Sequence, residues 1–137
     1  MDDLLITRDV IDGHVLLRAA GELNALNVQL FTDAIRHATE ETGVQRFIVD
    51  VGDLGLVDST GLGALVSEHK NAAAHGGYIR LLNMRAGLLE ALYTTRLDAL
   101  FPRYLTVQDA IAGVARHPSG AMVEPEGLPE EPPEEES

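Results

Sequence analysis

Short apolar runs and segments of helical periodicity alternate along most of the chain. Apolar residues around 4–11 and 14–20 predict two strands, and Asp12-Gly13 between them predicts the tight turn of a hairpin. The residues at 21–24 are expected to end the second strand, and Asn24 or Asn27 is expected to cap a helix. That helix closes at Thr42-Gly43, and its apolar residues recur every three or four positions: Phe31, Ala34, Ile35 and Ala38.

The second half of the chain continues this alternation. Phe47 to Val51 is nearly all apolar, which is typical of a strand covered on both faces. The elements predicted after it are, in order, a helix ending at Gly76-Gly77, a strand over 78–82, a short helix over 86–92 and a short strand or turn over 97–101. Thr106, with Asp109 three residues later, predicts the N-cap of a last helix. A strand between two helical segments requires a parallel crossover, so we predict an α/β fold.

Charge and proline content divide the chain near Pro118. All 10 basic residues and 15 of the 22 acidic residues precede it, whereas residues 118–137 hold five of the six prolines and seven glutamates. So few apolar residues cannot form a core, and we expect one domain over 1–117 and a disordered acidic tail over 118–137. The acidic body also lacks the basic face that nucleic acid requires of a partner.

Cysteine is absent, which excludes disulfides and thiolate metal sites. The N-terminal residues are acidic, and no stretch approaches the roughly 18 apolar residues of a membrane span. The sequence therefore predicts a soluble, cytoplasmic protein that has neither nucleic acid nor a membrane as its partner.

The stretch from Leu54 to Val66 is predicted to be the turn between the central strand and a helix. It holds the candidate chemistry, because the free N–H groups and the dipole of a helix start favour an anion. Two glycines there, Gly61 and Gly63, each cost the helix roughly 1 kcal/mol. They indicate close packing, either of a docking molecule or of the preceding loop. Lys70 is the only lysine, which argues against a phosphate cradle built from a glycine-rich loop and a lysine.

The sequence gives little support for Ser59 as a catalytic nucleophile. The residues before it do not match the G-x-S-x-G pattern of a nucleophile elbow, and a serine nucleophile needs a base. None of the five histidines can be assigned as that base or is spaced as a metal pair, and we expect all of them on the surface or on helix flanks: His14, His37, His69, His75 and His117. The sequence assigns no catalytic residue, metal ligand or cofactor.

Three aspartates, Asp50, Asp53 and Asp58, follow the central strand or lie at its end. The carboxyl ends of parallel strands are where ligands bind, so a Mg²⁺ site or an aspartyl-phosphate site is one interpretation. The other is that Asp53 lies in a turn and Asp58 caps the helix. Ser59 can also be a substrate, because a phosphate would add about −1.5 to −2 charges at a helix start, where they are tolerated. The alternative is that Ser59 or Thr60 is only a helix cap.

Several separated segments resemble STAS domains, in particular the bacterial anti-sigma factor antagonists. Val57-Asp58-Ser59-Thr60-Gly61-Leu62-Gly63 resembles the signature of the family. The resemblance covers about residues 4–115, and its other segments are Gly21-Glu22-Leu23, Arg46 to Asp50, and Leu97 to Phe101 followed by the helix at Thr106. It implies a STAS-like α/β fold with a mixed β-sheet of four to five strands and about four helices packed mainly on one face.

The resemblance also implies a function without enzymatic activity. The unphosphorylated protein would bind an anti-sigma factor that is also a serine kinase and so release a sigma factor. Phosphorylation of Ser59 would end that binding, and a PP2C-type phosphatase would reset it. The implied partner-binding residues are Glu22, Asn24, Asp58, Ser59, Thr60, Gly61, Leu62 and Gly63. An alternative within the family is a STAS scaffold subunit, without the switch, of a stress-signalling or lipid-transport complex.

Two positions depart from the family pattern. Asn24 stands where the family has an aspartate, which changes the charge near Ser59. Thr94-Thr95-Arg96 replaces the more usual turn before the last segment and predicts a modified surface there.

Overall fold

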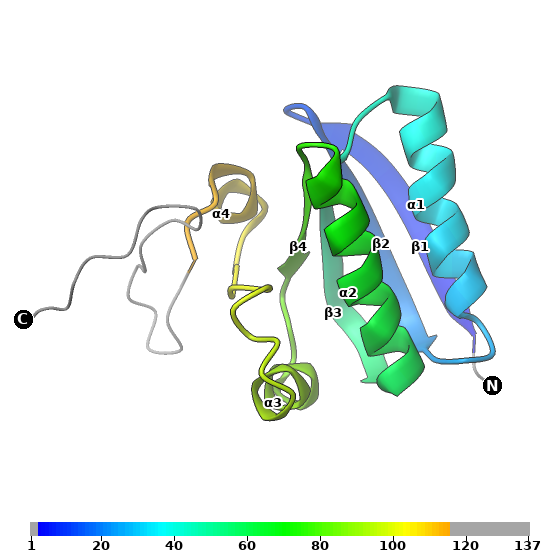
Figure 1. The fold of residues 1–137 in the computed structure, drawn as a ribbon, viewed down its shortest axis with the longest axis vertical. Helices are drawn as coiled ribbons and strands as arrows, with labels where there is room; N and C mark the ends of the chain where they lie inside the picture. The colour runs from blue at the N-terminus through cyan, green and yellow to red at the C-terminus, as the bar shows by residue number, and fades with distance from the viewer. Residues whose placement is uncertain (1–2, 116–137) are drawn as a thin grey trace, which may run out of the picture.

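A computed structural model describes residues 3–115 of the chain, and the predicted acidic tail lies outside these residues. Within the described range the chain forms four strands and four helices (Figure 1). Their order is β1 (Leu4–Ile11), β2 (His14–Leu23), α1 (Val28–Thr42), β3 (Arg46–Val57), α2 (Ser59–Ala74), β4 (Tyr78–Leu82), α3 (Ala86–Thr94) and α4 (Val107–Ala112).

The strands form one sheet in the order β1-β2-β3-β4. β1 and β2 are antiparallel with Ile11 opposite His14, so Asp12 and Gly13 form a two-residue hairpin loop. Both loop residues have positive φ, 48° and 74°, as the loop that matches the natural twist of a hairpin requires. β2, β3 and β4 are parallel. The predicted hairpin, parallel crossover and mixed sheet are therefore confirmed.

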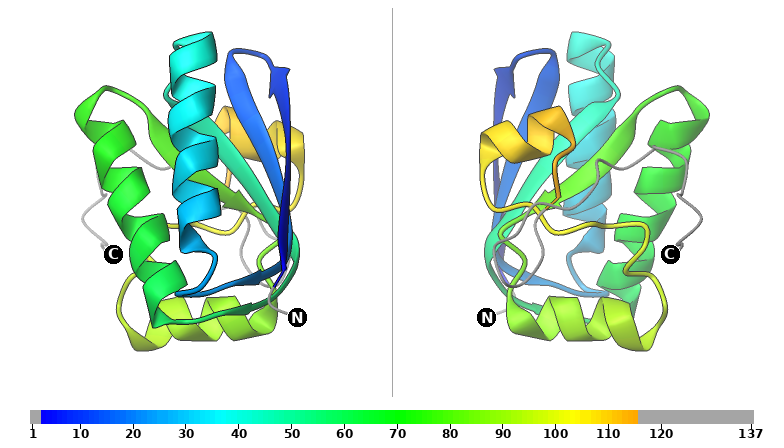
Figure 2. Two further views of the ribbon diagram at one scale, coloured as in Figure 1. Left: turned by 90° about the vertical axis from the view of Figure 1, so that its right-hand side faces the viewer. Right: turned by 90° about the vertical axis from the view of Figure 1, so that its left-hand side faces the viewer.

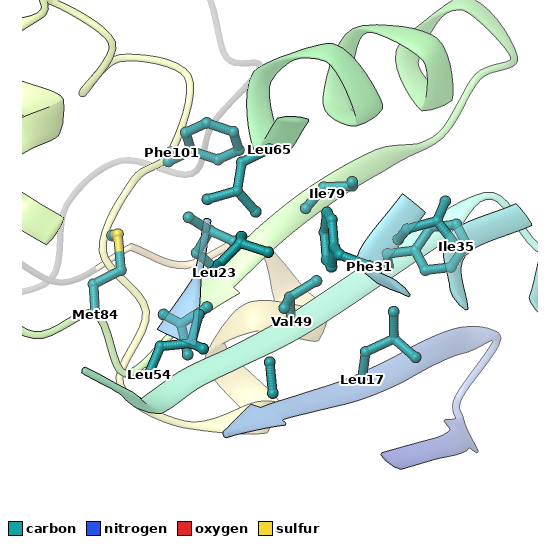
Figure 3. Close-up of a cluster of buried hydrophobic side chains, with 14 of the residues drawn as sticks. Leu17, Leu23, Phe31, Ile35, Val49, Leu54, Leu65, Ile79, Met84 and Phe101 are labelled. Carbon is teal, nitrogen blue, oxygen red and sulfur yellow. The ribbon is translucent and has the colours of Figure 1, made fainter. Parts of the chain in front are cut away.

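The two long helices, α1 and α2, cover one face of this sheet (Figure 1). Their apolar residues meet the sheet in the main core, which includes Leu23, Phe31 and Leu65 (Figure 3). The short helix α4 lies on the opposite face, and α3 lies across the end of the sheet at which β3 finishes (Figure 2). α4 covers a smaller cluster that contains Leu16, Ile48, Leu82, Tyr104 and Ala110. The predicted STAS-like fold class is confirmed.

In place of a fifth strand, the described residues form a single β-bridge. Tyr104 pairs with Leu82 as an isolated parallel bridge beside β4, whereas residues 97–101 form turns. Thr106 caps α4 as predicted, because its Oγ1 accepts a hydrogen bond of 3.0 Å from the backbone N–H of Asp109. None of the helices in residues 3–115 has the length and apolar character needed to cross a membrane.

Two strands are longer than the sequence predicts. β2 runs through Gly21 to Leu23, although Gly21 was the expected break. Gly21 keeps the strand going at a φ of 114°, where a Cβ would lie only 2.1 Å from the carbonyl oxygen of Asp3. β3 continues to Val57, so residues 54–57 pair with β2 and only Asp58 separates β3 from α2. Asp53 therefore lies in a strand, and its assignment to a turn is wrong.

Candidate functional site

The start of α2 is fixed by Asp58. This residue is extended, with φ −83° and ψ −176°, and its Oδ1 accepts a hydrogen bond of 2.8 Å from the backbone N–H of Gly61. A side-chain oxygen in this position satisfies one of the unpaired N–H groups of the first helical turn. Asp58 is thus the N-cap, and the interpretation of Asp58 as a cap is confirmed.

Asp58 also joins α2 to the end of β2 and to the loop that follows. Its backbone N–H donates to the carbonyl oxygen of Leu23 over 3.1 Å, and its Oδ2 accepts from the backbone N–H of Ala25 over 3.3 Å. Two segments far apart in the sequence, residues 22–27 and 57–63, therefore form one surface.

The hydroxyl of Ser59 has no structural task. Ser59 and Thr60 are both exposed, and neither side chain forms a hydrogen bond to another of residues 3–115. Because Asp58 already serves as the cap, the idea that Ser59 or Thr60 is only a cap is wrong. Ser59 occupies the first helical position with its hydroxyl facing solvent, so an enzyme in solution can reach it.

The two glycines of this turn serve different purposes. Gly61 is buried, and a Cβ there would lie 2.6 Å from the carbonyl oxygen of Leu23 and 2.9 Å from its Cγ. Gly61 therefore permits α2 to pack closely on the end of β2, and not on the preceding loop as one of the two explanations had it. Gly63 is exposed, and a Cβ there would meet nothing within 4 Å. Leu62 is buried in the core.

Asn24 and Asn27 hold the loop between β2 and α1. Oδ1 of Asn27 accepts from the backbone N–H of Asn24 over 2.9 Å, and Oδ1 of Asn24 accepts from that of Leu26 over 2.9 Å. Nδ2 of Asn27 donates to the carbonyl oxygen of Glu22 over 2.9 Å. Asn27 is the N-cap residue of α1, as one of the two predicted candidates. Its side chain, however, makes no capping hydrogen bond to that helix.

Sequence reasoning missed three large exposed apolar side chains, each within three residues of the two segments, 22–27 and 57–63, that Asp58 joins. Leu26, Leu30 and Leu56 have exposed fractions of 83%, 54% and 59%. Leu26 adjoins the Ala25 that binds Asp58, and Leu56 pairs across the sheet with Glu22. The available signal was that Leu26 precedes α1 and Leu30 falls outside the apolar periodicity of that helix. We call Glu22, Leu26, Leu30, Leu56, Asp58 and Ser59 the Ser59 surface.

Two of the three aspartates at the end of the central strand, Asp50 and Asp58, are engaged in other contacts. Asp50 accepts hydrogen bonds from the backbone N–H of Gly52 over 2.9 Å and from Nδ2 of Asn83 over 3.3 Å, and it faces Arg18 at 3.7 Å. Asp58 is the N-cap of α2. Within residues 3–115, no group of three or more histidine, aspartate or glutamate side chains is placed to hold a metal ion.

The expected surface location of the histidines is wrong for His14. This residue is buried, its Nδ1–H donates to the carbonyl oxygen of Asp12 over 2.8 Å, and its Nε2 accepts from the hydroxyl of Tyr78 over 2.6 Å. Burial lowers its pKa, and the nearby Arg46 and Arg80 lower it further, against the raising effect of the Asp12 carbonyl. His14 lies at the start of β2, about 30 Å from the end of that strand, and is no base for Ser59.

His69 also has a structural contact. Its Nδ1 accepts from the backbone N–H of Ile79 over 3.0 Å, and it lies about 15 Å along α2 from Ser59.

A family model for the STAS domain matches residues 6–110. A Thermotoga maritima protein provisionally named an anti-sigma factor antagonist is 27% identical over 107 residues, which cover 78% of this chain and 95% of that protein. The solved structure of an anti-sigma factor antagonist from Mycobacterium paratuberculosis has a TM-score of 0.70 at 20% identity, over 81% of this chain and 93% of the other.

Two further structures show SpoIIAA, an anti-sigma factor antagonist and Bacillus cell fate determinant. The unphosphorylated form has a TM-score of 0.67 at 22% identity, over 78% of this chain and 93% of the other. The phosphorylated form has a TM-score of 0.63 at 22% identity, over 79% and 97%. At this identity the likeness shows a shared fold.

Proposed function

This chain belongs to the STAS domain family, and from that premise we propose that it is an anti-sigma factor antagonist that phosphorylation of Ser59 switches off. The relatives with similar sequences and folds bear that name. The observation that carries the proposal is the Ser59 hydroxyl, which is exposed at the start of α2 and free of any capping role.

The reaction at Ser59 is a phosphoryl transfer by the partner. The Ser59 oxygen attacks the γ-phosphorus of ATP held by an anti-sigma factor with serine kinase activity, the bond to the β-phosphate oxygen breaks, and ADP leaves. The proton of the hydroxyl passes to a base of the kinase. A PP2C-type phosphatase hydrolyses the resulting ester and restores the hydroxyl. The chain supplies the acceptor and no catalytic group, so we propose that it is not an enzyme.

The Ser59 surface explains why the phosphate would end binding. Exposed leucines together with polar groups on one surface are typical of a docking site, in which the apolar anchors supply most of the binding energy. A phosphate on Ser59 would place about two negative charges beside the carboxylate of Asp58 in the middle of this surface. A partner that had desolvated the hydroxyl would then have to bury that charge.

We propose that, besides Glu22, the residues Asn24, Thr60 and Gly63 belong to this docking surface. With Asn24 in place of an aspartate, the surface carries one negative charge fewer. The Oδ1 of Asn24 stabilises the loop by accepting a hydrogen bond from the backbone N–H of Leu26. Gly61 and Leu62 are buried and support the surface from below. Sigma factors act on cytoplasmic RNA polymerase, so we place the protein in the cytoplasm.

Labelling with radioactive ATP tests the assignment of Ser59. We expect a candidate anti-sigma kinase to label the wild-type chain and the Thr60→Ala variant and to leave the Ser59→Ala variant unlabelled. Thr60→Ala is the matched control because its hydroxyl is exposed one residue away. Label on another residue would contradict the proposal.

A phosphomimetic variant tests the effect on docking. Ser59→Asp should weaken binding to the anti-sigma factor by about 2–5 kcal/mol, because the partner would bury an unpaired charge. The fold should survive, because the charge lies at a helix N-terminus. Ser67→Asp, on an exposed position further along α2, is the control and should leave binding unchanged. Affinity from calorimetry and melting temperature from circular dichroism are the two measurements.

The same experiment separates the switch from a scaffold. If Ser59→Asp and Ser59→Ala both bind like the wild type, and the protein is recovered in a large stress-signalling or lipid-transport assembly, the chain is a STAS subunit without the switch. A melting temperature that collapses in Ser59→Asp would instead assign Ser59 a structural role.

A further inference from the structure

A small hollow lies between the end of β3 and the start of α3. Its volume is about 100 Å³, and its wall is mainly apolar except for one arginine. The lining residues that matter here are Val51, Leu54, Val57, Arg85, Gly87 and Leu88. We call this the β3–α3 hollow. An apolar recess with a single cation at its rim favours a ligand that has an apolar part next to a negative charge.

Arg85 is the cation at the rim, and it has no carboxylate partner among residues 3–115. Its only hydrogen bond there is a long one, 3.4 Å from Nη1 to the carbonyl oxygen of Leu54. By contrast, Arg8, Arg18 and Arg36 each pair with at least one aspartate or glutamate. In a chain with 22 acidic and 10 basic residues, an exposed arginine without an acidic partner is an available hydrogen-bond donor for a carboxylate.

The chain itself supplies a segment of matching chemistry. Residues 116–137 lie outside the described residues. Their sequence contains seven glutamates, one arginine and one histidine, so it is strongly acidic. The one place in them where two adjacent large apolar residues precede a glutamate is Met122-Val123-Glu124. An apolar pair followed by a carboxylate is the combination that the hollow and Arg85 favour.

The segment is close enough to reach the hollow. Ala115, the last described residue, is buried in the same cluster as Leu82, and Leu82 is three residues before Arg85. The seven residues from Ala115 to Met122 span up to about 24 Å when extended, compared with a radius of gyration of about 13 Å for a domain of this size. A tethered segment also has an effective concentration on the order of millimolar, so that a weak contact suffices.

We propose that Met122-Val123-Glu124 docks in the β3–α3 hollow of its own chain. The two apolar side chains lie against Leu54 and Leu88, and the carboxylate of Glu124 pairs with the guanidinium of Arg85. Val57, in the wall of the hollow, immediately precedes Asp58, so the docked tail brings its glutamates next to the Ser59 surface. A further consequence, which rests on the proposed function, is that the tail and the anti-sigma factor compete.

A spin label on the tail tests the docking without any partner protein. The chain has no cysteine, so Gly127→Cys gives one attachment site for a nitroxide, three residues beyond the docking segment. In the full-length labelled chain we expect selective paramagnetic broadening of the amides of Leu56, Gly87 and Leu88 relative to those of α1. Arg85→Gln should abolish this selectivity, and so should the double change of Met122 and Val123 to serine.

Arg96→Gln is the matched control, because it removes another exposed positive charge that does not line the hollow. It should keep the broadening. Broadening that is uniform or absent, or that persists in Arg85→Gln, overturns the proposal. Broadening that grows with protein concentration also overturns it, because the tail would then dock on a second copy. Since no partner is needed, failure here leaves the proposed role of Ser59 untouched.

Discussion

Asp58 shows how one carboxylate can organise a site at the residue scale. One oxygen caps α2 and the other holds the loop after β2, while the backbone N–H of the same residue pairs with Leu23. With these tasks assigned to Asp58, the adjacent Ser59 contributes nothing to the fold. A residue that the fold does not need can change its charge without unfolding the protein, which is what a switch requires.

Replacing Asp58 separates its hydrogen bonds from its charge. Asp58→Ala should lower the free energy of unfolding by about 0.5–2 kcal/mol, because the N–H groups of Gly61 and Ala25 lose their acceptor. Asp58→Asn keeps an oxygen acceptor and should lose less. Urea unfolding of the three proteins measures the difference. Equal stability of Asp58→Ala and the wild type would contradict the capping role.

The two glycines offer a second matched pair. Gly61→Ala should destabilise the protein by about 1–3 kcal/mol, because the new methyl group would overlap the backbone of Leu23. Gly63→Ala meets open space and should stabilise α2 by up to about 1 kcal/mol through helix propensity. Thermal unfolding of both variants measures this. The prediction fails if the two substitutions change the melting temperature in the same direction.

At the scale of elements, an arginine of β4 adds polar contacts to the apolar cluster that attaches the short helix α4 to the sheet. Nη1 of Arg80 donates to the carbonyl oxygens of Ala110 and Ile111, over 2.7 and 3.3 Å, at the C-terminal end of α4. Its guanidinium also stacks 3.7 Å above the ring of Tyr78. A cation is favoured at the end of a helix where carbonyl groups are unpaired. A helix of 6 residues would be marginal without such a contact.

Arg80→Met should therefore loosen α4 more than the rest of the domain. Hydrogen bonds to a charged group contribute about 1.5–3 kcal/mol, and we expect a loss of this size in the opening free energy of the α4 amides. Native-state hydrogen exchange resolves α4 from α1. Arg96→Met, at an exposed position after α3, is the control and should leave both helices unchanged. Equal loss in α1 and α4 would indicate a global effect instead.

At the scale of the whole molecule, the sheet separates two environments. The face under α1 and α2 has an apolar core with the Arg8–Glu41 ion pair between β1 and α1, whereas the second face carries the cluster of Arg80, Tyr78 and buried His14 next to α4. His14 and the Ser59 surface lie at opposite ends of β2, because His14 begins that strand and Leu23 ends it. We therefore expect the pH dependence of stability to arise at one end of β2, whereas the proposed docking surface lies at the other.

The pH dependence of folding has a definite sign. The pKa of His14 lies below the value of 6.5 for an unperturbed histidine, mainly through burial. The unfolded state then binds more protons between these two pKa values, so stability should fall as the pH drops through 6.5 and level off below the folded pKa. The slope from this one group is at most about 1.4 kcal/mol per pH unit.

Urea unfolding between about pH 7.5 and 5.5 measures the effect, and His14→Gln should flatten this part of the profile. An NMR titration of the His14 ring checks the direction of the shift directly. A ring that titrates at or above 6.5, or identical slopes in the two proteins, would contradict this account.

The sequence alone determined the features that depend on neighbouring residues. Asp12-Gly13 specifies its hairpin because few residue pairs adopt two successive positive φ values, and the periodicity of Phe31, Ile35 and Ala38 specifies a helix with one buried face. The candidate site could be predicted in outline for the same reason, because Asp58 to Gly63 is a local pattern.

Only the tertiary structure decided features that depend on distant contacts. β2 extends past Gly21 and β3 reaches Val57 because the two strands pair with each other, which local propensity cannot show. Asp58, rather than Ser59, is the cap, and Gly61, rather than Gly63, is required by packing, because the end of β2 lies against α2. Leu26 is exposed and His14 is buried for the same physical reason: burial is a property of the assembled layers and not of the residue.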